Sequence, residues 1–160
     1  MSDVASEAGA IRIFVDADAC PVRSEAERVA ERHGLRVFMV SDGGIRPSRH
    51  PLVETVIVAA GADAADDWIA GRIGRGDICV TADIPLAARV IEAGGRAIKP
   101  TGEVLDARNI GPALAARDLM ADLRAADPAG IARPERGGRP FTKADRGRFA
   151  DALDRIARRH

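Results

Sequence analysis

Aromatic residues are scarce in this chain: its 160 residues include no tyrosine, one tryptophan and four phenylalanines. Base-stacking platforms made of aromatic side chains, which many single-strand binding modules use, are therefore not expected. The hydrophobic fraction is nevertheless 46%, so the core must be built mainly from Val, Ile, Leu and Ala. Such cores are typical of parallel sheets covered by helices. A chain of this length is expected to form one domain.

Cysteines and long apolar runs are also nearly absent. Only Cys20 and Cys79 occur, which is too few for a disulfide framework or a zinc site. No apolar run approaches the roughly 20 residues that cross a bilayer. The polar first residues lack the basic and apolar regions of a signal peptide. We therefore expect a cytoplasmic protein without membrane contact.

The chain has no net charge, because Lys plus Arg and Asp plus Glu number 24 each. Their placement is uneven: residues 132–160 hold nine basic and four acidic residues, against 15 and 20 before them. A basic tail favours a polyanionic partner such as RNA, since cations that contact phosphates release counterions. A solvated helix surface explains the same charges equally well. The oligomeric state is left open.

Short β-branched runs alternate with helical segments along most of the chain. The expected strands are 11–15, 35–40, 54–58, 78–81 and 96–98, and the expected helices are 22–33, 63–72, 84–93, 110–125 and 142–159. Repeated strand–helix units predict a mostly parallel sheet with right-handed crossovers. The sequence therefore predicts an α/β fold with about five strands flanked by helices.

Composition also divides the chain into segments. We expect a flexible N-terminus over 1–10, an α/β domain over 11–126, a flexible linker over 127–141 and a basic C-terminal helix over 142–160. The linker is rich in proline and glycine, which favours mobility. In the last helix Thr142 is a suitable N-cap, and Phe149, Leu153 and Ile156 share one face. We expect that face to pack on the domain.

Aspartates follow three of the predicted strands. Because parallel strands end at the same edge, these aspartates should meet where open sheets bind their ligands. Carboxylates that share a site resist joint ionisation unless a cation compensates, and Mg²⁺ or Mn²⁺ prefers such oxygen ligands. The predicted metal ligands are Asp16, Asp18, Asp63, Asp66, Asp67 and Asp83. Helix capping remains the alternative for any single one of them.

A divalent ion at this edge can orient a water and neutralise charge on a phosphodiester, as in two-metal nucleases. The Ser41–Gly44 turn and Thr81 face the same edge and offer hydroxyls and backbone amides to a phosphate. Positive or polar side chains in a proline-bounded loop and on the last helix are further candidates for phosphate contacts. The predicted substrate-binding residues are Thr81, Ser41, Arg46, Ser48, Lys143 and Arg146.

Three blocks of sequence resemble the signature blocks of the bacterial YaiI/YqxD family. They are Val15-Asp16-Ala17-Asp18-Ala19-Cys20-Pro21, Gly61-Ala62-Asp63-Ala64-Ala65-Asp66 and Thr81-Ala82-Asp83-Ile84-Pro85-Leu86-Ala87. The likeness continues through Asn109-Ile110, the stretch from Arg117 to Arg124, and the region from Asp145 to Phe149. It therefore covers nearly the whole chain after Ala10.

This family is poorly characterised but is grouped with PIN-like domains, which are three-layer, metal-dependent ribonucleases with clustered acids. The resemblance implies that Asp16, Asp66 and Asp83 are catalytic. Asp66 or Asp67 is similar to the acid on the central PIN helix, and Asp18 and Asp63 belong to this family's own blocks. A typical PIN domain adds a glutamate from an intermediate helix. No counterpart is placed here, and Asp63 or Asp18 is the candidate substitute.

Two other classes of function fit parts of the pattern. The strand followed by Asp16-x-Asp18 also resembles haloacid-dehalogenase-like phosphatases, in which the first aspartate is the nucleophile. Those enzymes place a lysine before a terminal acidic pair, whereas here Asp66 and Asp67 precede Lys99. The third class is a non-catalytic module that binds a metal or RNA. Fold analogy alone does not decide among the three.

Overall fold

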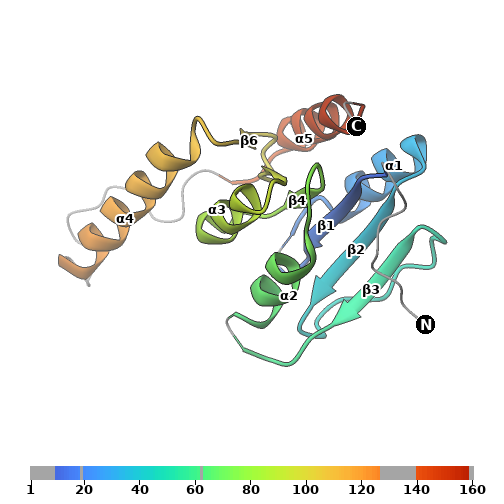
Figure 1. Cartoon of the computed structure of the whole chain (residues 1–160), viewed down its shortest axis with the longest axis horizontal. Coiled ribbons are helices and arrows are strands. Elements are labelled where there is room, and N and C mark those ends of the chain that lie inside the picture. Colours follow the sequence, from blue (N-terminus) through green and yellow to red (C-terminus); the bar gives the residue numbers. More distant parts are fainter. Residues whose placement is uncertain (1–9, 19, 62, 127–139, 159–160) are drawn as a thin grey trace.

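A computed structural model describes residues 10–18, 20–61, 63–126 and 140–158. These residues form an α/β fold with a six-stranded sheet in the order β3-β2-β1-β4-β5-β6 (Figure 1). The strands are β1 (Arg12–Asp16), β2 (Arg36–Ser41), β3 (Val53–Ile57), β4 (Ile78–Val80), β5 (Arg96–Ile98) and β6 (Val104–Leu105). The first five pair in parallel, which confirms the predicted fold class.

Strand β6 is the one element of the sheet that the sequence did not predict. It has two residues and pairs antiparallel with β5, so that Val104 lies opposite Ile98. A turn leads into it, closed by hydrogen bonds from the backbone N–H of Gly102 to the carbonyl of Lys99 and from Lys99 N–H to Glu103. A strand this short has no detectable alternation in sequence.

Helices cover both faces of the sheet and give the fold three layers (Figure 1). They are α1 (Arg23–His33), α2 (Ala64–Arg72), α3 (Ile84–Glu92), α4 (Ile110–Ala126) and α5 (Lys143–Ala157). Helices α1 and α5 pack over one face, and α2 and α3 over the other. None of the described helices has both the length and the apolar character needed to cross a membrane.

The central strand β1 is buried on both sides, as a parallel strand between two helical layers must be. Ile13 and Val15 point into the core beneath α1 and α5. Phe14 points the other way, and its ring stacks on Phe38 with 5.1 Å between centroids. Trp68 from α2 closes this aromatic group. The scarce aromatic residues are therefore mostly used as core.

The ends of the helices follow local chemistry. Helix α1 stops at Gly34, whose φ of 68° is a left-handed conformation that favours glycine. Helix α3 begins behind Asp83, whose carboxylate accepts the backbone N–H of Leu86. Helix α5 begins with a capping box between Thr142 and Asp145, as the sequence indicated for Thr142. These caps fix the residues at which the three helices end or begin.

Helix α5 lies against α1. Phe149 and Leu153 are fully buried in the core that α1 and the sheet form. Further along, Asp154 accepts hydrogen bonds from Arg32 at 3.0 Å and pairs with His33 at 2.8 Å. Arg158 also pairs with it, and these partners hold the pKa of Asp154 below its ordinary value. The segments 1–9 and 127–139, expected to be flexible, lie outside the described residues.

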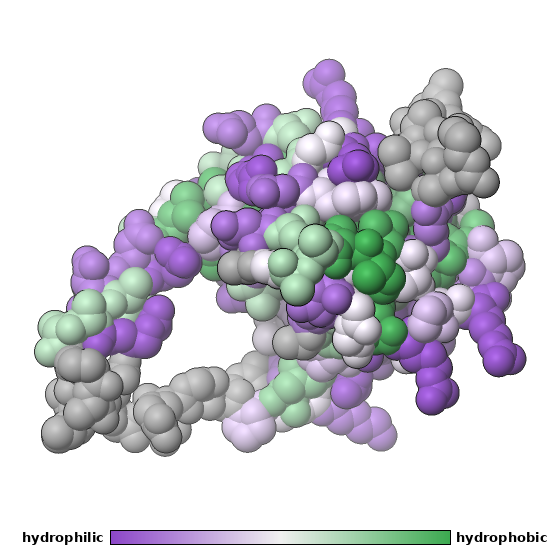
Figure 2. All heavy atoms as spheres, turned by 90° about the horizontal axis from the view of Figure 1, so that it is seen from below, coloured by the Kyte–Doolittle hydropathy of each residue, from purple (hydrophilic) through white to green (hydrophobic). Residues whose placement is uncertain are grey.

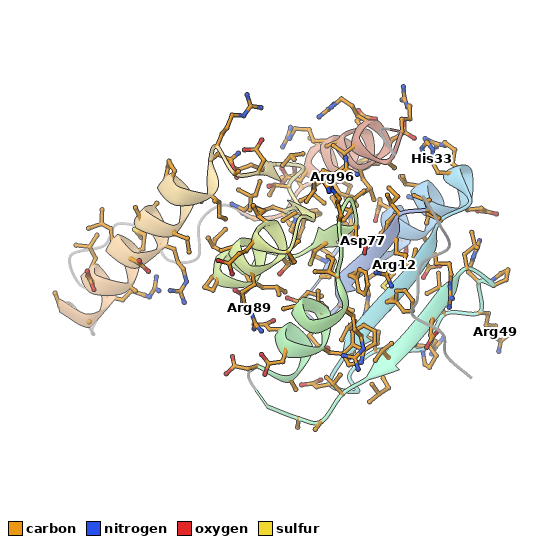
Figure 3. The ribbon with its side chains drawn as sticks, viewed as in Figure 1. Arg12, His33, Arg49, Asp77, Arg89 and Arg96 are labelled. Atoms are coloured by element: carbon orange, nitrogen blue, oxygen red, sulfur yellow. The ribbon has the colours of Figure 1, made fainter. Side chains whose placement is uncertain are left out.

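At the amino edge of the sheet, a buried ion pair joins β1 to the start of β4. The Arg12 guanidinium lies 2.7 Å from Asp77, and both side chains are nearly inaccessible (Figure 3). The second Asp77 oxygen accepts the backbone N–H of Arg12 at 2.9 Å. Gly74 donates a further backbone N–H to this carboxylate. Asp77 is thus a fully compensated structural acid.

Candidate metal centre

The two halves of the sheet diverge at β1. The chain runs from β1 to β2 and β3 on one side, then returns to place β4 and β5 on the other. In open α/β sheets the ligand crevice lies at such a switch point, outside the carboxyl ends of the strands. A pocket of about 430 Å³ occurs there. It is lined by Asp16, Asp18, Asp42, Gly61, Ala65, Asp66 and Asp83.

Asp16 is the last residue of β1, and a neighbouring hydroxyl orients its carboxylate. Thr81, which follows β4 and is 2% exposed, donates its hydroxyl proton to Asp16 Oδ2 at 2.9 Å. The Thr81 oxygen in turn accepts the backbone N–H of Asp83 at 3.0 Å. Thr81 therefore links the ends of β1 and β4, and its proton is engaged by Asp16.

Asp18 is held in a similar way from the other side of β1. Ser41, the fully buried last residue of β2, donates its hydroxyl proton to Asp18 Oδ1 at 2.7 Å. The backbone N–H of Asp42 donates to Asp18 Oδ2 at 3.0 Å. Gly43 N–H donates to the Ser41 oxygen. Both oxygens of Asp18 thus accept hydrogen bonds, which fixes the orientation of its carboxylate.

Asp66 reaches the pocket from the first turn of α2. Burial, the charges of Asp83 and Asp16, and a hydrogen bond with Asp83 raise its pKa to about 6. A hydrogen bond between two carboxyl groups requires that one of them carries a proton. Asp83 completes the pair from the start of α3, while its Oδ1 accepts the N–H of Leu86. Like charges on the two carboxyl groups repel each other, which is one of the reasons that the pKa of Asp66 is raised.

Negative charge accumulates in this pocket without a cation. Burial raises the pKa of Asp16, and the charges of Asp83 and Asp18 add to the effect while the Thr81 hydrogen bond opposes it. Five aspartates line the pocket, and its described lining contains no Lys, Arg or His. Such an arrangement is unfavourable until a positively charged group enters.

Two of the predicted metal ligands lie outside this lining. Asp67 is exposed and its carboxylate pairs with Arg89 of α3 at 2.9 Å (Figure 3). Asp63 is exposed at the N-terminal end of α2, although its charge is near enough to raise the pKa of Asp66. Of the three acids at this helix start, only Asp66 lines the pocket.

The predicted substrate-binding residues separate into two groups. Ser41 and Thr81 lie at the base of the acidic pocket, but their protons are directed at carboxylates. The others lie outside its lining. Ser48 donates to Glu27 of α1 at 3.1 Å, and Arg146 approaches the Pro21 carbonyl and Glu25. Arg46 and Lys143 are exposed.

Asp42 lines the pocket and was not among the predicted ligands. It directly follows β2, so it reaches the carboxyl edge for the same reason as Asp16 and Asp83. The signal was present in the sequence, because every acid that follows a parallel strand is carried to that edge. Asp42 was not predicted as a ligand because the turn from Ser41 to Gly44 was interpreted as a phosphate contact.

The sequence profile of the uncharacterised YaiI/YqxD family matches residues 14–159. This chain belongs to the YaiI/YqxD family. A UPF0178 protein from Ruegeria pomeroyi is 63% identical over 146 residues, covering 91% of this chain and 93% of that protein. One from Cereibacter sphaeroides is 61% identical, covering 92% and 89%, and one from Rhizobium meliloti is 53% identical, covering 92% and 97%. No solved structure matches the chain.

The blocks that resemble the YaiI/YqxD family are also the ones that supply most of the pocket. Asp16 and Asp18 come from the first block, Gly61, Ala65 and Asp66 from the second, and Asp83 from the third. Asp42 comes from outside them. Membership in an uncharacterised family assigns no activity to this YaiI/YqxD chain.

The pocket suits a hard divalent cation by ligand type and by charge. Carboxylate oxygens are the ligands that Mg²⁺ and Mn²⁺ prefer. The distances between the side chains do not yet suit an ion. In the part of the chain that the structure describes, no three acidic, histidine or cysteine side chains converge closely enough to hold one. The raised pKa of Asp66, to which burial and the charges of Asp83 and Asp16 contribute, indicates that positive charge is most needed beside this carboxyl.

Proposed function

We propose that this protein is a divalent-metal-dependent nuclease that acts on RNA. The observation that carries the proposal is the set of five aspartates around one pocket at the switch point of the sheet, with no cation in the described lining. Burial, with their mutual repulsion adding to it, raises the pKa values of Asp16 and Asp66. A bound Mg²⁺ or Mn²⁺ relieves that repulsion, which gives metal binding its driving force.

Asp16, Asp66 and Asp83 are the proposed direct ligands, and binding requires their carboxylates to move closer together than they lie in the structure, where no three such side chains among the described residues converge on one point. Thr81 engages one oxygen of Asp16, Oδ2, and orients the carboxylate. Asp18 and Asp42 surround the site with further negative charge, and Asp18 is fixed by Ser41. Divalent ions act on phosphodiesters as Lewis acids that stabilise developing charge. Asp66, with a pKa of about 6 before metal binding, releases its proton near neutral pH.

RNA is the proposed substrate class, and the resemblance to PIN-like ribonucleases supports it. Few aromatic residues are available for base stacking, and the rings of Phe14, Phe38 and Trp68 pack together in the core. We therefore propose contacts with phosphates rather than sequence-specific readout. Arg146 is suitably placed for this, because it contacts Pro21 and Glu25 beside the loop that follows β1.

The haloacid-dehalogenase-like alternative has less support in the structure. Phosphoryl transfer to Asp16 would require a cation near the phosphate and a carboxylic acid able to donate a proton. Lys99 pairs with Glu103 at 3.1 Å and does not line the pocket. Asp18 accepts hydrogen bonds at both oxygens and so acts as an acceptor. Detection of a phosphoaspartate at Asp16 would restore this alternative.

The decisive experiment uses two adjacent residues of α2. Asp66→Asn changes the pocket, whereas Asp67→Asn makes the same change at an exposed acid outside it. We expect calorimetry to show Mn²⁺ binding to the wild type and to Asp67→Asn, with affinity at least about tenfold weaker for Asp66→Asn. Cleavage of an RNA and DNA panel with Mn²⁺ should follow the same order, and Asp16→Asn and Asp83→Asn should abolish it.

Each result has a distinct meaning. If the wild type binds neither Mg²⁺ nor Mn²⁺, the metal centre is disproved. If the wild type binds metal and RNA in electrophoretic assays but no substrate is cleaved, the protein is a binding module. If Asp67→Asn loses activity as completely as Asp66→Asn, the ligand set is wrong, although the activity stands.

A further inference from the structure

Helix α4 carries three of the four large hydrophobic side chains that are exposed among the described residues. None of its 17 residues is buried, and Leu119, Met120 and Leu123 are 58%, 46% and 47% exposed. Its first turn is anchored, because Ile110 and Ala113 pack on a small cluster formed by α3, β5 and β6. The rest of α4 projects away from the sheet (Figure 1), and Figure 2 shows it standing clear of the body.

The exposed apolar side chains form one stripe. Ala116, Leu119, Met120 and Leu123 follow the spacing i, i+3, i+4 and i+7, which places them on the same face of the helix. In proteins, most of the stability of a helix comes from the packing of such a face. A contiguous exposed stripe of this kind marks an interaction surface. We call these four residues the α4 stripe.

The two edges of the α4 stripe carry opposite charges. With about 100° of rotation per residue, Arg117 and Arg124 lie along one edge, while Asp122 and, further round, Asp118 lie along the other. Arg117 also pairs with Asp118 at 3.4 Å, but an exposed pair of this kind contributes little. The charges of the helix therefore cancel overall and are separated across the stripe.

We propose that the α4 stripe binds the α4 stripe of a second copy of this chain, with the two helices parallel about a two-fold axis. In that arrangement the arginine edge of each helix meets the aspartate edge of the other, twice. An antiparallel pair would place arginine edge against arginine edge. The chain has no net charge, so two copies do not repel each other at long range. Because the charges on α4 cancel, the helix offers no net electrostatic attraction to a polyanion.

The first test measures mass in solution by sedimentation equilibrium. The wild type is expected to be a dimer at micromolar concentration, and Leu119→Glu with Leu123→Glu is expected to be a monomer. The matched pair is Leu123→Glu alone and Ala125→Glu, which adds the same single charge at an exposed residue on the opposite face of α4; Ala125→Glu should remain a dimer, whereas Leu123→Glu should dissociate more readily. Circular dichroism checks that the sheet domain stays folded in each variant.

The second test distinguishes parallel from antiparallel pairing. Arg117→Asp with Arg124→Asp gives both edges the same sign and should weaken the dimer at least about tenfold. Adding Asp118→Arg and Asp122→Arg restores opposite edges and should restore the dimer. A monomeric wild type, a dimer unaffected by Leu119→Glu with Leu123→Glu, or failure of the charge exchange to restore pairing would each overturn the proposal. A monomer whose α4 gains helicity on anionic lipid vesicles would assign the stripe to a membrane surface instead.

Discussion

The two edges of the sheet differ in how the negative charge of their aspartates is compensated. At the amino edge, Asp77 lies against Arg12 and also accepts two backbone N–H groups. At the carboxyl edge, Asp16, Asp66 and Asp83 lie close to one another, and no cationic side chain lines their pocket in the described part of the chain. The first acid is compensated within the chain. The second group needs a proton or an external cation.

This difference separates a structural acid from the candidate functional acids. A buried ion pair is costly to break, because removal of one partner leaves the other uncompensated. An uncompensated cluster is costly to keep and is retained where function needs it. The carboxyl edge should therefore gain stability when an acid is removed, whereas the amino edge should lose it.

The largest effect is expected at the amino edge. Asp77→Ala leaves the Arg12 guanidinium buried without its partner and two backbone N–H groups without acceptors. We expect the free energy of unfolding to fall by about 3–5 kcal/mol, measured by urea denaturation. Asp67→Ala, which breaks the exposed pair with Arg89, should cost less than about 1 kcal/mol. Equal losses in the two variants would contradict the contrast.

Asp66→Asn should change the free energy of unfolding in the opposite direction. The pKa of Asp66 is about 6 in the folded protein against an ordinary value of 3.8, so the folded state binds the proton more tightly. Stability therefore falls as pH rises from about 4 to about 6, and the penalty is complete above that range. With solvent screening of this partly exposed group, removal of the charge should stabilise the metal-free protein by about 1 kcal/mol at pH 7.5.

Thermal unfolding without divalent ions at several pH values provides the measurement. The stabilisation by Asp66→Asn should disappear below pH 4, where the wild-type carboxyl is already protonated. Saturating Mn²⁺ should reverse the ranking, since the wild type then gains binding energy that the variant lacks. A variant that is less stable than wild type at pH 7.5 without metal would show that Asp66 is compensated by a group within the protein.

The smallest effect is expected for Thr81→Val. Its hydroxyl stabilises the charged form of Asp16, so its loss should raise the pKa of Asp16 further. The change in unfolding free energy should be about 1 kcal/mol, the usual scale of one hydrogen bond. Carbon-detected NMR titration of the aspartate carboxyls would measure the pKa. A pKa of Asp16 that stays constant or falls in this variant would remove Thr81 from the site.

Much of the fold could be predicted from local sequence. The apolar run at β1 and the glycine that ends α1 are local signals, and their expected positions agree with the structure to within one or two residues. Strand β6 could not be predicted, because two residues cannot display a period. The packing of α5 on α1 joins Leu153 to a core that lies far from it in sequence, and only its apolar face indicated such a contact.

The candidate site likewise combines residues that the sequence identified with residues that only the structure could distinguish. Asp16 and Asp83 could be identified because each follows a parallel strand, and parallel topology carries both to one edge. The sequence could not distinguish Asp66 from Asp67, since both occupy the first turn of α2. The structure distinguishes them, because Arg89 of the neighbouring helix pairs with Asp67 and Asp66 lines the pocket.

The sequence alone thus determined the layered α/β fold and the edge at which the acids gather, because strand–helix alternation and parallel pairing leave few other arrangements. Tertiary structure decided which acids share the pocket and that Ser41 and Thr81 donate to carboxylates. It also decided that the described residues leave the α4 stripe exposed. These outcomes depend on side chains brought together from distant segments, and local pattern does not encode that proximity.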